Sequence, residues 1–245
     1  RRKTFEAKGL DYVSDLALLN VKDLKTIVQW NNEMGVKLFR LSSQIFPWSD
    51  DYKLSDLKDY NEIYKLMLEI GEIATDANQR LTMHPGPYNC LASPNQKVVE
   101  KTIRELNVHS EQFNMLGFEP SNYNKINIHV GGAYGGDFIG TSARWIAGWH
   151  RLSDNLKARL VLENDDKASM WSTKMIYDYF HKEIGIPITF DYHHHTFHPD
   201  ELSEEEALRL AASTWPDDVR QCCHYSESKA REYCDDKIRK QAHSD

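Results

Sequence analysis

Residues 159–165 read RLVLEND, a short apolar run that leads into the carboxylate of Glu163. This run predicts a β-strand over 159–163. Similar runs recur along the chain between longer amphipathic stretches, and this alternation is typical of βαβ units around a parallel sheet. The complete set of predicted strands is 36–41, 80–84, 126–130, 159–163, 188–191 and 221–225.

The amphipathic stretches between the strands predict helices, several of which begin at serine and end at glycine, as helix caps do. Ser203 and Glu206 have the spacing of a capping box at such a start. The predicted helices are 21–34, 55–77, 94–116, 142–156, 172–184 and 203–212. Because no repeat or linker interrupts the alternation, we expect a single domain over residues 1–245.

The residues at the strand ends decide between a closed barrel and an open sheet. They are Ser42 and Ser43, His84, His129, Glu163, Asp191 and His224. The carboxyl ends of all strands in a parallel barrel meet at one face, where barrel enzymes hold their active sites, whereas a doubly wound sheet brings only two or three together. We therefore predict an α/β fold, a (β/α)8 barrel of the TIM type. Six strands are two short of eight, so we expect a chain truncated at both ends that lacks the first and last strands.

The bulk composition excludes several classes of protein. No run of about 18 apolar residues is present to span a membrane, and the basic start of the chain lacks the apolar stretch of a secretory signal. Four cysteines without a C-x-x-C pair favour a reducing compartment. We expect an intracellular protein, cytoplasmic if the source is bacterial and nuclear if it is eukaryotic. The formal net charge of -7 argues against a nucleic-acid partner, while bound divalent cations would add positive charge that this count omits.

The candidate functional residues are imidazoles and carboxylates, which are the ligands that suit Zn²⁺, Mn²⁺ and Fe²⁺. They are His84, His129, Glu163, Asp191, His194, His224 and His243. One carboxylate can bridge two ions, and such clusters bind the attacking and leaving oxygens of a phosphodiester. A single strand histidine is more often an ordinary core or loop residue. Five successive strands that end in ligand-type residues, however, predict a multinuclear metal centre.

The run His193-His194-His195 follows a predicted strand. Because side chains alternate on extended backbone, the three cannot all face one site, and we expect His194 to be the ligand. The other two, with His198, are expected to bond backbone or DNA phosphate. The histidines within predicted helices are expected at the surface, and these are His109, His150 and His181.

Seven short motifs accompany the strand ends. They are FRLSSQIFPW (39–48), MHPGPY (83–88), IHVGG (128–132), LVLEND (160–165), FDYHHH (190–195), HYSES (224–228) and AHSD (242–245). In order and in spacing they resemble the motif series of the UV-damage endonucleases. The resemblance covers nearly the whole chain, and it implies a barrel endonuclease that is related in architecture to the endonuclease IV type of apurinic-site nuclease.

The resemblance implies a centre of up to three divalent ions, with Mn²⁺ expected and Zn²⁺, Mg²⁺ or Co²⁺ as alternatives. The implied ligand sets, with Glu163 bridging the first two ions, are His84, His129 and Glu163; Glu163, Asp191 and His224; and His194 and His243. The implied reaction is hydrolysis of the phosphodiester immediately 5′ of a pyrimidine dimer or 6-4 product, with apurinic sites as a further substrate. The implied partner is double-stranded DNA with UV lesions, bound by a monomer with no obligate protein partner and no membrane.

This chain departs from the family pattern at two positions. After HPG the family has a Gln and an aromatic residue that fill the gap left by flipped-out bases. Tyr88 matches the aromatic residue, with ordinary loop packing as its alternative, but Pro87 replaces the Gln and cannot hydrogen-bond the orphaned bases. Cys222 replaces a lysine that lies near the metals in the family. Either a group that tunes the metal centre is lost at this position or a thiolate ligand is gained. The family's last strand, with a further glutamate ligand, would follow Asp245.

Three other functions compete with this interpretation. Sugar isomerases and epimerases share the barrel and use Glu, Asp and His ligands at strand ends. An apurinic-site endonuclease without photoproduct activity is closer still. A third alternative is a protein that binds damaged DNA without cutting it, which the missing glutamate would favour.

Overall fold

Residues 2–244 are described by a computed structural model, and their contacts divide the chain into two units. Unit 1 comprises Arg1–Gly86, Glu100–Ile126 and Leu152–Arg159. Unit 2 comprises Pro87–Val99, Asn127–Arg151 and Leu160–Asp245. The chain passes between the units several times, and a single domain over 1–245 stays a prediction. Among the described residues, no helix combines the length and the apolar character that crossing a membrane requires.

The strands of unit 1 pair in parallel, as the sequence predicts. β1 (Leu38–Leu41) lies beside β2 (Arg80–Met83). Met83 at the end of β2 pairs with Ile126, the first residue of β3 (Ile126–His129). The order of the strands follows the order of the chain, which is the arrangement that successive βαβ units produce.

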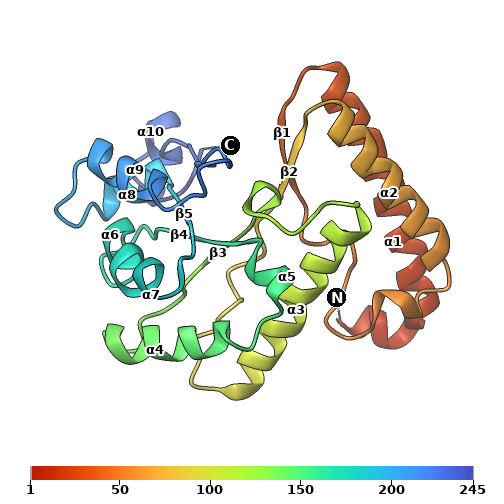
Figure 1. Ribbon diagram of the computed structural model, residues 1–245, viewed down its shortest axis with the longest axis horizontal. Helices are drawn as coiled ribbons and strands as arrows, with labels where there is room; N and C mark the ends of the chain where they lie inside the picture. Colours follow the sequence, from red (N-terminus) through yellow and green to blue (C-terminus); the bar gives the residue numbers. More distant parts are fainter. Residues whose placement is uncertain (1, 245) are drawn as a thin grey trace. The chain divides into compact units, whose positions relative to one another are not determined.

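A long helix, α1 (Arg2–Glu33), precedes β1 and has one break, at Gly9. The predicted start of this helix at residue 21 is wrong, because its buried face begins earlier. The buried side chains on it recur every three or four residues and are Val13, Ala17, Val21, Leu24 and Val28. α2 (Tyr60–Asp76) lies side by side with α1 (Figure 1), and the Nζ of Lys25 is 2.7 Å from Oε2 of Glu69 across this contact.

Most of α3 (Gln96–Met115) also belongs to unit 1. His109 on this helix is only 1% exposed, and its Nδ1 lies 3.3 Å from Nε2 of Gln112. The predicted surface position of His109 is therefore wrong. Its spacing from Leu106 and Phe113, which are both buried, places it on the inner face of the helix. The short elements of unit 1 are η1 (Leu54–Asp56), η2 (Asn122–Asn124) and α5 (Asp154–Lys157).

In unit 2, β4 (Leu160–Glu163) pairs in parallel with β5 (Ile188–Thr189). The predicted strand at 221–225 is wrong, because this segment forms an isolated bridge in which His224 lies opposite Asp191. The backbone N of His224 donates to the oxygen of Phe190 at 2.9 Å. The pairing ends there because the chain after Asp191 turns into a helix, which offers no extended partner.

That helix, α8 (Tyr192–Phe197), carries the histidine run. Asp191 is its N-cap, since Oδ1 of Asp191 accepts a hydrogen bond from the backbone N of His194 at 2.8 Å. The prediction of extended backbone with alternating side chains is therefore wrong. All three histidines of the run are buried.

The other helices of unit 2 pack mainly on one another, and α9 also contacts β5. Ser203 and Glu206 form the predicted capping box at the start of α9. The single helix predicted over 142–156 is wrong, because α4 begins earlier with Asp137 as its cap and Ser153 caps a separate α5. These helices are α4 (Phe138–Trp149), α6 (Thr173–Ile176), the π turn η3 (Tyr177–His181), α7 (Lys182–Ile184), α9 (Glu204–Ala212) and α10 (Lys229–Glu232).

Gly71 lies on the buried face of α2, where a Cβ would stand 1.8 Å from the backbone oxygen of Leu116. We expect Gly71→Ala to lower the free energy of unfolding by about 2–3 kcal/mol, because the two backbones must separate. Urea unfolding followed by circular dichroism measures this change. The control is Gly132→Ala, since no heavy atom lies within 4 Å of a Cβ built there. A Gly71→Ala protein as stable as the control would contradict the close approach.

Candidate metal centre

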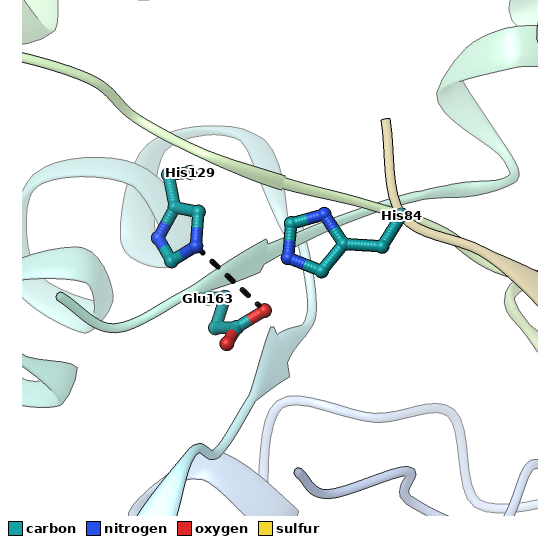
Figure 2. Close-up of side chains that lie close together, drawn as sticks. All are labelled: His84, His129 and Glu163. Carbon is teal, nitrogen blue, oxygen red and sulfur yellow. Dashed lines mark ion pairs between the residues drawn. The ribbon is translucent and has the colours of Figure 1, made fainter. Parts of the chain in front are cut away.

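The carboxylate of Glu163 lies at the end of β4, is 2% exposed and is surrounded by imidazoles of unit 2. Its Oε2 is 3.0 Å from Nδ1 of His224 and 4.0 Å from Nε2 of His129. Its Oε1 is 3.6 Å from Nδ1 of His194. Figure 2 shows the ring of His129 directed at this carboxylate, with their ion pair dashed. A buried carboxylate with several nitrogen neighbours is a chemical environment that suits a divalent cation.

Two groups of three potential ligands lie within unit 2. The first is Glu163, Asp191 and His224, and the second is Asp191, His194 and His243. Each residue of a group offers one ligand atom, and the ligand atoms of each group lie within 4.8 Å of one another. Asp191 belongs to both groups. The structure thus brings together six of the seven ligands expected from the sequence, five in these two groups and His129 beside Glu163.

His84, the seventh expected ligand, follows β2 in unit 1. Its side chain is partly buried, and its Nδ1 lies 3.0 Å from the backbone oxygen of Pro85. Figure 2 draws His84 with His129 and Glu163, the three residues that the resemblance assigns to one ion. A hydrogen bond at Nδ1 leaves Nε2 of His84 as the nitrogen that can bind a metal.

Three further polar residues, which the sequence pattern did not indicate, hold the candidate ligands in place. Asn127 donates through Nδ2 to Oε2 of Glu163. Asp165 places its Oδ1 3.1 Å from Nδ1 of His129, which is the carboxylate–histidine arrangement that commonly orients a metal-binding imidazole. The END motif at 163–165 was the available signal for Asp165, but an acidic residue beside a ligand is also typical of a surface loop.

Asn164 connects two elements of the centre. Its Oδ1 accepts from the backbone N of Asp191 at 2.8 Å, and its Nδ2 donates to the backbone oxygen of Asp191 at 3.0 Å. Its own backbone oxygen is 2.7 Å from Nδ1 of His194. Asn164 is fully buried, so these contacts fix the start of α8 relative to the end of β4.

The charges around His129 favour a positive occupant. Burial alone would lower the pKa of His129, but the hydrogen bond to Asp165 and the negative charges of Glu163, Asp165 and Asp191 outweigh burial and raise this pKa to about 9. The groups around His129 therefore favour a positive charge at this position. A divalent cation would supply the same compensation.

The other histidines of the run do not enter the ligand groups. The ring of His193 packs against that of His243, with centroids 4.8 Å apart, and the ring of His195 packs against Phe190 at 5.2 Å. Burial lowers the pKa of His195, which also bonds the backbone of Leu202. His194 is the member of the run that the structure groups with acidic residues.

Cys222 is 6% exposed and packs in an apolar cluster with Val161 and Trp215. It belongs to no ligand group among residues 2–244. Its side chain packs there as a small apolar group, so the geometry supports the loss of the family's lysine at this position rather than a thiolate ligand.

Pro87 and Tyr88 lie in a turn of unit 2 that follows the HPG motif. Pro87 is exposed, and the side chain of Tyr88 is 86% exposed. Ordinary loop packing does not describe a tyrosine with this exposure. Its ring is available for contact with another molecule.

Comparison with known proteins gives consistent matches over the whole chain. A family model described as "UV-endonuclease UvdE" matches residues 2–245. The UV-damage endonuclease of Schizosaccharomyces pombe is 35% identical over 254 residues, which cover 100% of this chain and 41% of that protein. The UV-damage endonuclease of Neurospora crassa is 35% identical over 236 residues, which cover 89% of this chain and 34% of that protein. This chain therefore spans less than half the length of these fungal relatives.

Solved structures give the same fold. The chain superposes on the crystal structure of SacUVDE with a TM-score of 0.86 and 30% identity, covering 98% of this chain and 77% of that one. D-psicose 3-epimerase from Clostridium cellulolyticum superposes with a TM-score of 0.60 and 14% identity, covering 84% of this chain and 68% of that one. The second likeness shows the fold alone. Together they confirm the predicted α/β fold of the TIM-barrel type.

Replacing Glu163 by Gln keeps the shape of the side chain and removes its charge. We expect Glu163→Gln to bind at least one fewer equivalent of Mn²⁺ per chain, because a neutral amide is a poorer metal ligand than a carboxylate. Elemental analysis after gel filtration measures the metal content. Glu201→Gln is the control, since that side chain is 85% exposed. Equal metal content in both variants and the wild type would remove Glu163 from the centre.

Proposed function

The chain belongs to the UV-endonuclease UvdE family, and on this basis we propose that it hydrolyses the DNA phosphodiester immediately 5′ of UV photoproducts at a centre of divalent ions. The observation that carries the proposal is the convergence on buried Glu163 of His129, His194 and His224. These side chains come from the end of β3, from α8, which follows β5, and from the bridge opposite Asp191. They lie where a barrel enzyme assembles its active site, beyond the carboxyl ends of the strands.

We assign the ligands to three ions. His84, His129 and Glu163 would hold the first, and Glu163 with Asp191 and His224 would hold the second. Asp191, His194 and His243 would hold the third. The mixture of imidazoles and carboxylates favours Mn²⁺, Zn²⁺ or Co²⁺ over Mg²⁺, which prefers oxygen ligands and water. We propose Mn²⁺ as the ion in the working enzyme.

Divalent ions in such a centre lower the pKa of the attacking water and stabilise charge on the phosphoryl and leaving oxygens. The protein's own groups keep the ligands in position for this reaction. Asp165 orients His129, Asn127 restrains Glu163, and Asn164 fixes Asp191 and His194 together. Because Glu163 is almost fully buried, its charge acts in a medium that screens it poorly, and its attraction for cations is strong.

We propose that Tyr88 contacts the DNA duplex at the lesion. An exposed aromatic ring can stack on a base beside the gap that flipped-out nucleotides leave. Pro87 supplies rigidity to this turn but no hydrogen-bond donor from its backbone N. Recognition at this point would therefore depend on stacking, without hydrogen bonds from the residue before Tyr88 to the unpaired bases.

The competing functions predict different substrates. The epimerase neighbour shares the fold at 14% identity, and an epimerase would leave DNA intact. An apurinic-site endonuclease would cut depurinated DNA in preference to irradiated DNA. A binding protein without catalysis would retain irradiated DNA and not nick it.

A nicking assay tests the proposal. The full chain with Mn²⁺ should convert UV-irradiated supercoiled plasmid to the open circular form and leave unirradiated plasmid supercoiled. Glu163→Gln should reduce the rate by about 100-fold or more, because several kcal/mol of charge stabilisation are lost. Glu201→Gln should cut like the wild type. No lesion-dependent nicking by the wild type would reject the proposed activity.

A binding measurement tests Tyr88. Tyr88→Ala should weaken binding to a duplex with one cyclobutane dimer by about tenfold, because base–aromatic stacking contributes about 1–3 kcal/mol. Fluorescence anisotropy with Ca²⁺ in place of Mn²⁺ would measure affinity without cleavage. Tyr64→Ala is the control, since Tyr64 is exposed on α2. The proposed contact fails if Tyr88→Ala binds damaged DNA as tightly as the control does.

A further inference from the structure

Residues 229–242, which we call the clasp loop, leave and rejoin unit 2 at one narrow neck. Ser228 and His243 form an antiparallel bridge at this neck. The backbone N of Lys229 donates to the oxygen of Ala242, and the backbone N of Ser244 donates to the oxygen of Glu227, both at 2.8 Å. The neck therefore joins the two ends of the loop to each other.

The clasp loop packs loosely on α8. Residues 231–237 are all exposed. A cavity of about 510 Å³ lies between Phe197 of α8 and loop residues that include Arg231 and Cys234. Empty space of this size means few van der Waals contacts under the loop. Segments with exposed backbone and little apolar packing open locally at low free energy.

His243 at the neck faces α8. Its Nε2 lies 3.1 Å from Nε2 of His194, and its Nδ1 lies 2.6 Å from Oγ of Ser226. The hydrogen bond with Ser226 fixes the rotation of the ring and directs Nε2 toward His194. Two ring nitrogens this close repel one another through their lone pairs unless a proton or a cation is shared between them.

We propose that a divalent cation bound by Asp191, His194 and His243 fastens the clasp loop to α8, and that Ser226 is the positioning residue that directs His243. The inference rests on the proposed metal centre and adds a structural role for the third ion. Two of its ligands, Asp191 and His194, come from the cap and first turn of α8, and the third comes from the neck of the loop. Removing the ion would leave the loop attached through weaker contacts, such as the 2.8 Å ion pair of the exposed Arg239 with the partly buried Asp166.

The charge of the clasp loop suggests what its attachment to α8 would do for DNA binding. Residues 229–242 contain five Lys or Arg residues and three Asp or Glu residues, in a chain whose formal net charge is -7. The loop is thus locally basic beside the candidate metal centre, as a contact with phosphate requires. Loading of the third ion would hold these basic residues in place next to the proposed cleavage site.

Hydrogen exchange followed by mass spectrometry tests the proposal on the full chain. With free Mn²⁺ at about 100 times its dissociation constant, amide exchange in 229–242 should slow by up to about 100-fold, because opening would break the site. Ser226→Ala should shift the Mn²⁺ concentration needed for this protection upward by about tenfold. His243→Ala should lose the protection and one equivalent of bound metal. Ser213→Ala, which alters an exposed serine on α9's C-terminal cap, should match the wild type.

The possible failures are distinguishable. If the wild type binds Mn²⁺ and the exchange of 229–242 does not change, the proposed attachment of the clasp loop by the third ion is overturned, while the proposed metal centre is not. If the wild type binds no divalent ion, this attachment and the proposed metal centre are both overturned. If Ser226→Ala shows the same Mn²⁺ dependence as Ser213→Ala, the positioning role of Ser226 is overturned. Unchanged exchange in β4 and β5 of each variant confirms that it is folded.

Discussion

A negative charge buried at the end of β4 is the constraint on which the site depends. A carboxylate that is 2% exposed loses most of its hydration, and this loss must be compensated by hydrogen bonds or by positive charge. Asn127 supplies a hydrogen bond, and the imidazoles of His129 and His224 lie close enough to Oε2 to supply donors or to share a cation. The strand ends are arranged around Glu163, so that changing this one side chain alters the electrostatic environment of every neighbouring ligand.

Backbone pairing brings the ligands into this arrangement. The single bridge between Asp191 and His224 places two ligands from segments more than thirty residues apart against each other. Asn164 then bonds both backbone groups of Asp191, which lies in the element that follows β5. The positions of the ligands therefore come from parallel pairing at the ends of short strands. Outside the sheet, aromatic side chains join the helices to one another: Phe180 of η3 packs against Trp145 of α4 and against Trp171 of the loop before α6.

The sequence predicted five of the strands, and it selected most of the side chains that the structure brings together around Glu163. Both predictions depend on local patterns, namely short apolar runs and the residue at the end of each run. It did not predict α8, because the cap formed by Asp191 is a hydrogen bond that only the folded backbone shows. It predicted a full strand at 221–225 where only His224 pairs, since pairing depends on whether the neighbour stays extended.

Asn127 and Asn164 were missed because amides are not typical ligands, and their roles depend on distant partners. The burial of His109 follows from the rotation of α3, which its neighbours Leu106 and Phe113 would have indicated.

The cap of α8 also fixes the orientation of the Asp191 carboxylate. Its Oδ1 accepts a hydrogen bond from the backbone N of His194, so the first turn of the helix holds the carboxylate in one orientation. The same helix carries His194, so its backbone sets the position of both side chains at once. A helix cap, which is an ordinary device of secondary structure, therefore also aligns two side chains of the candidate metal centre.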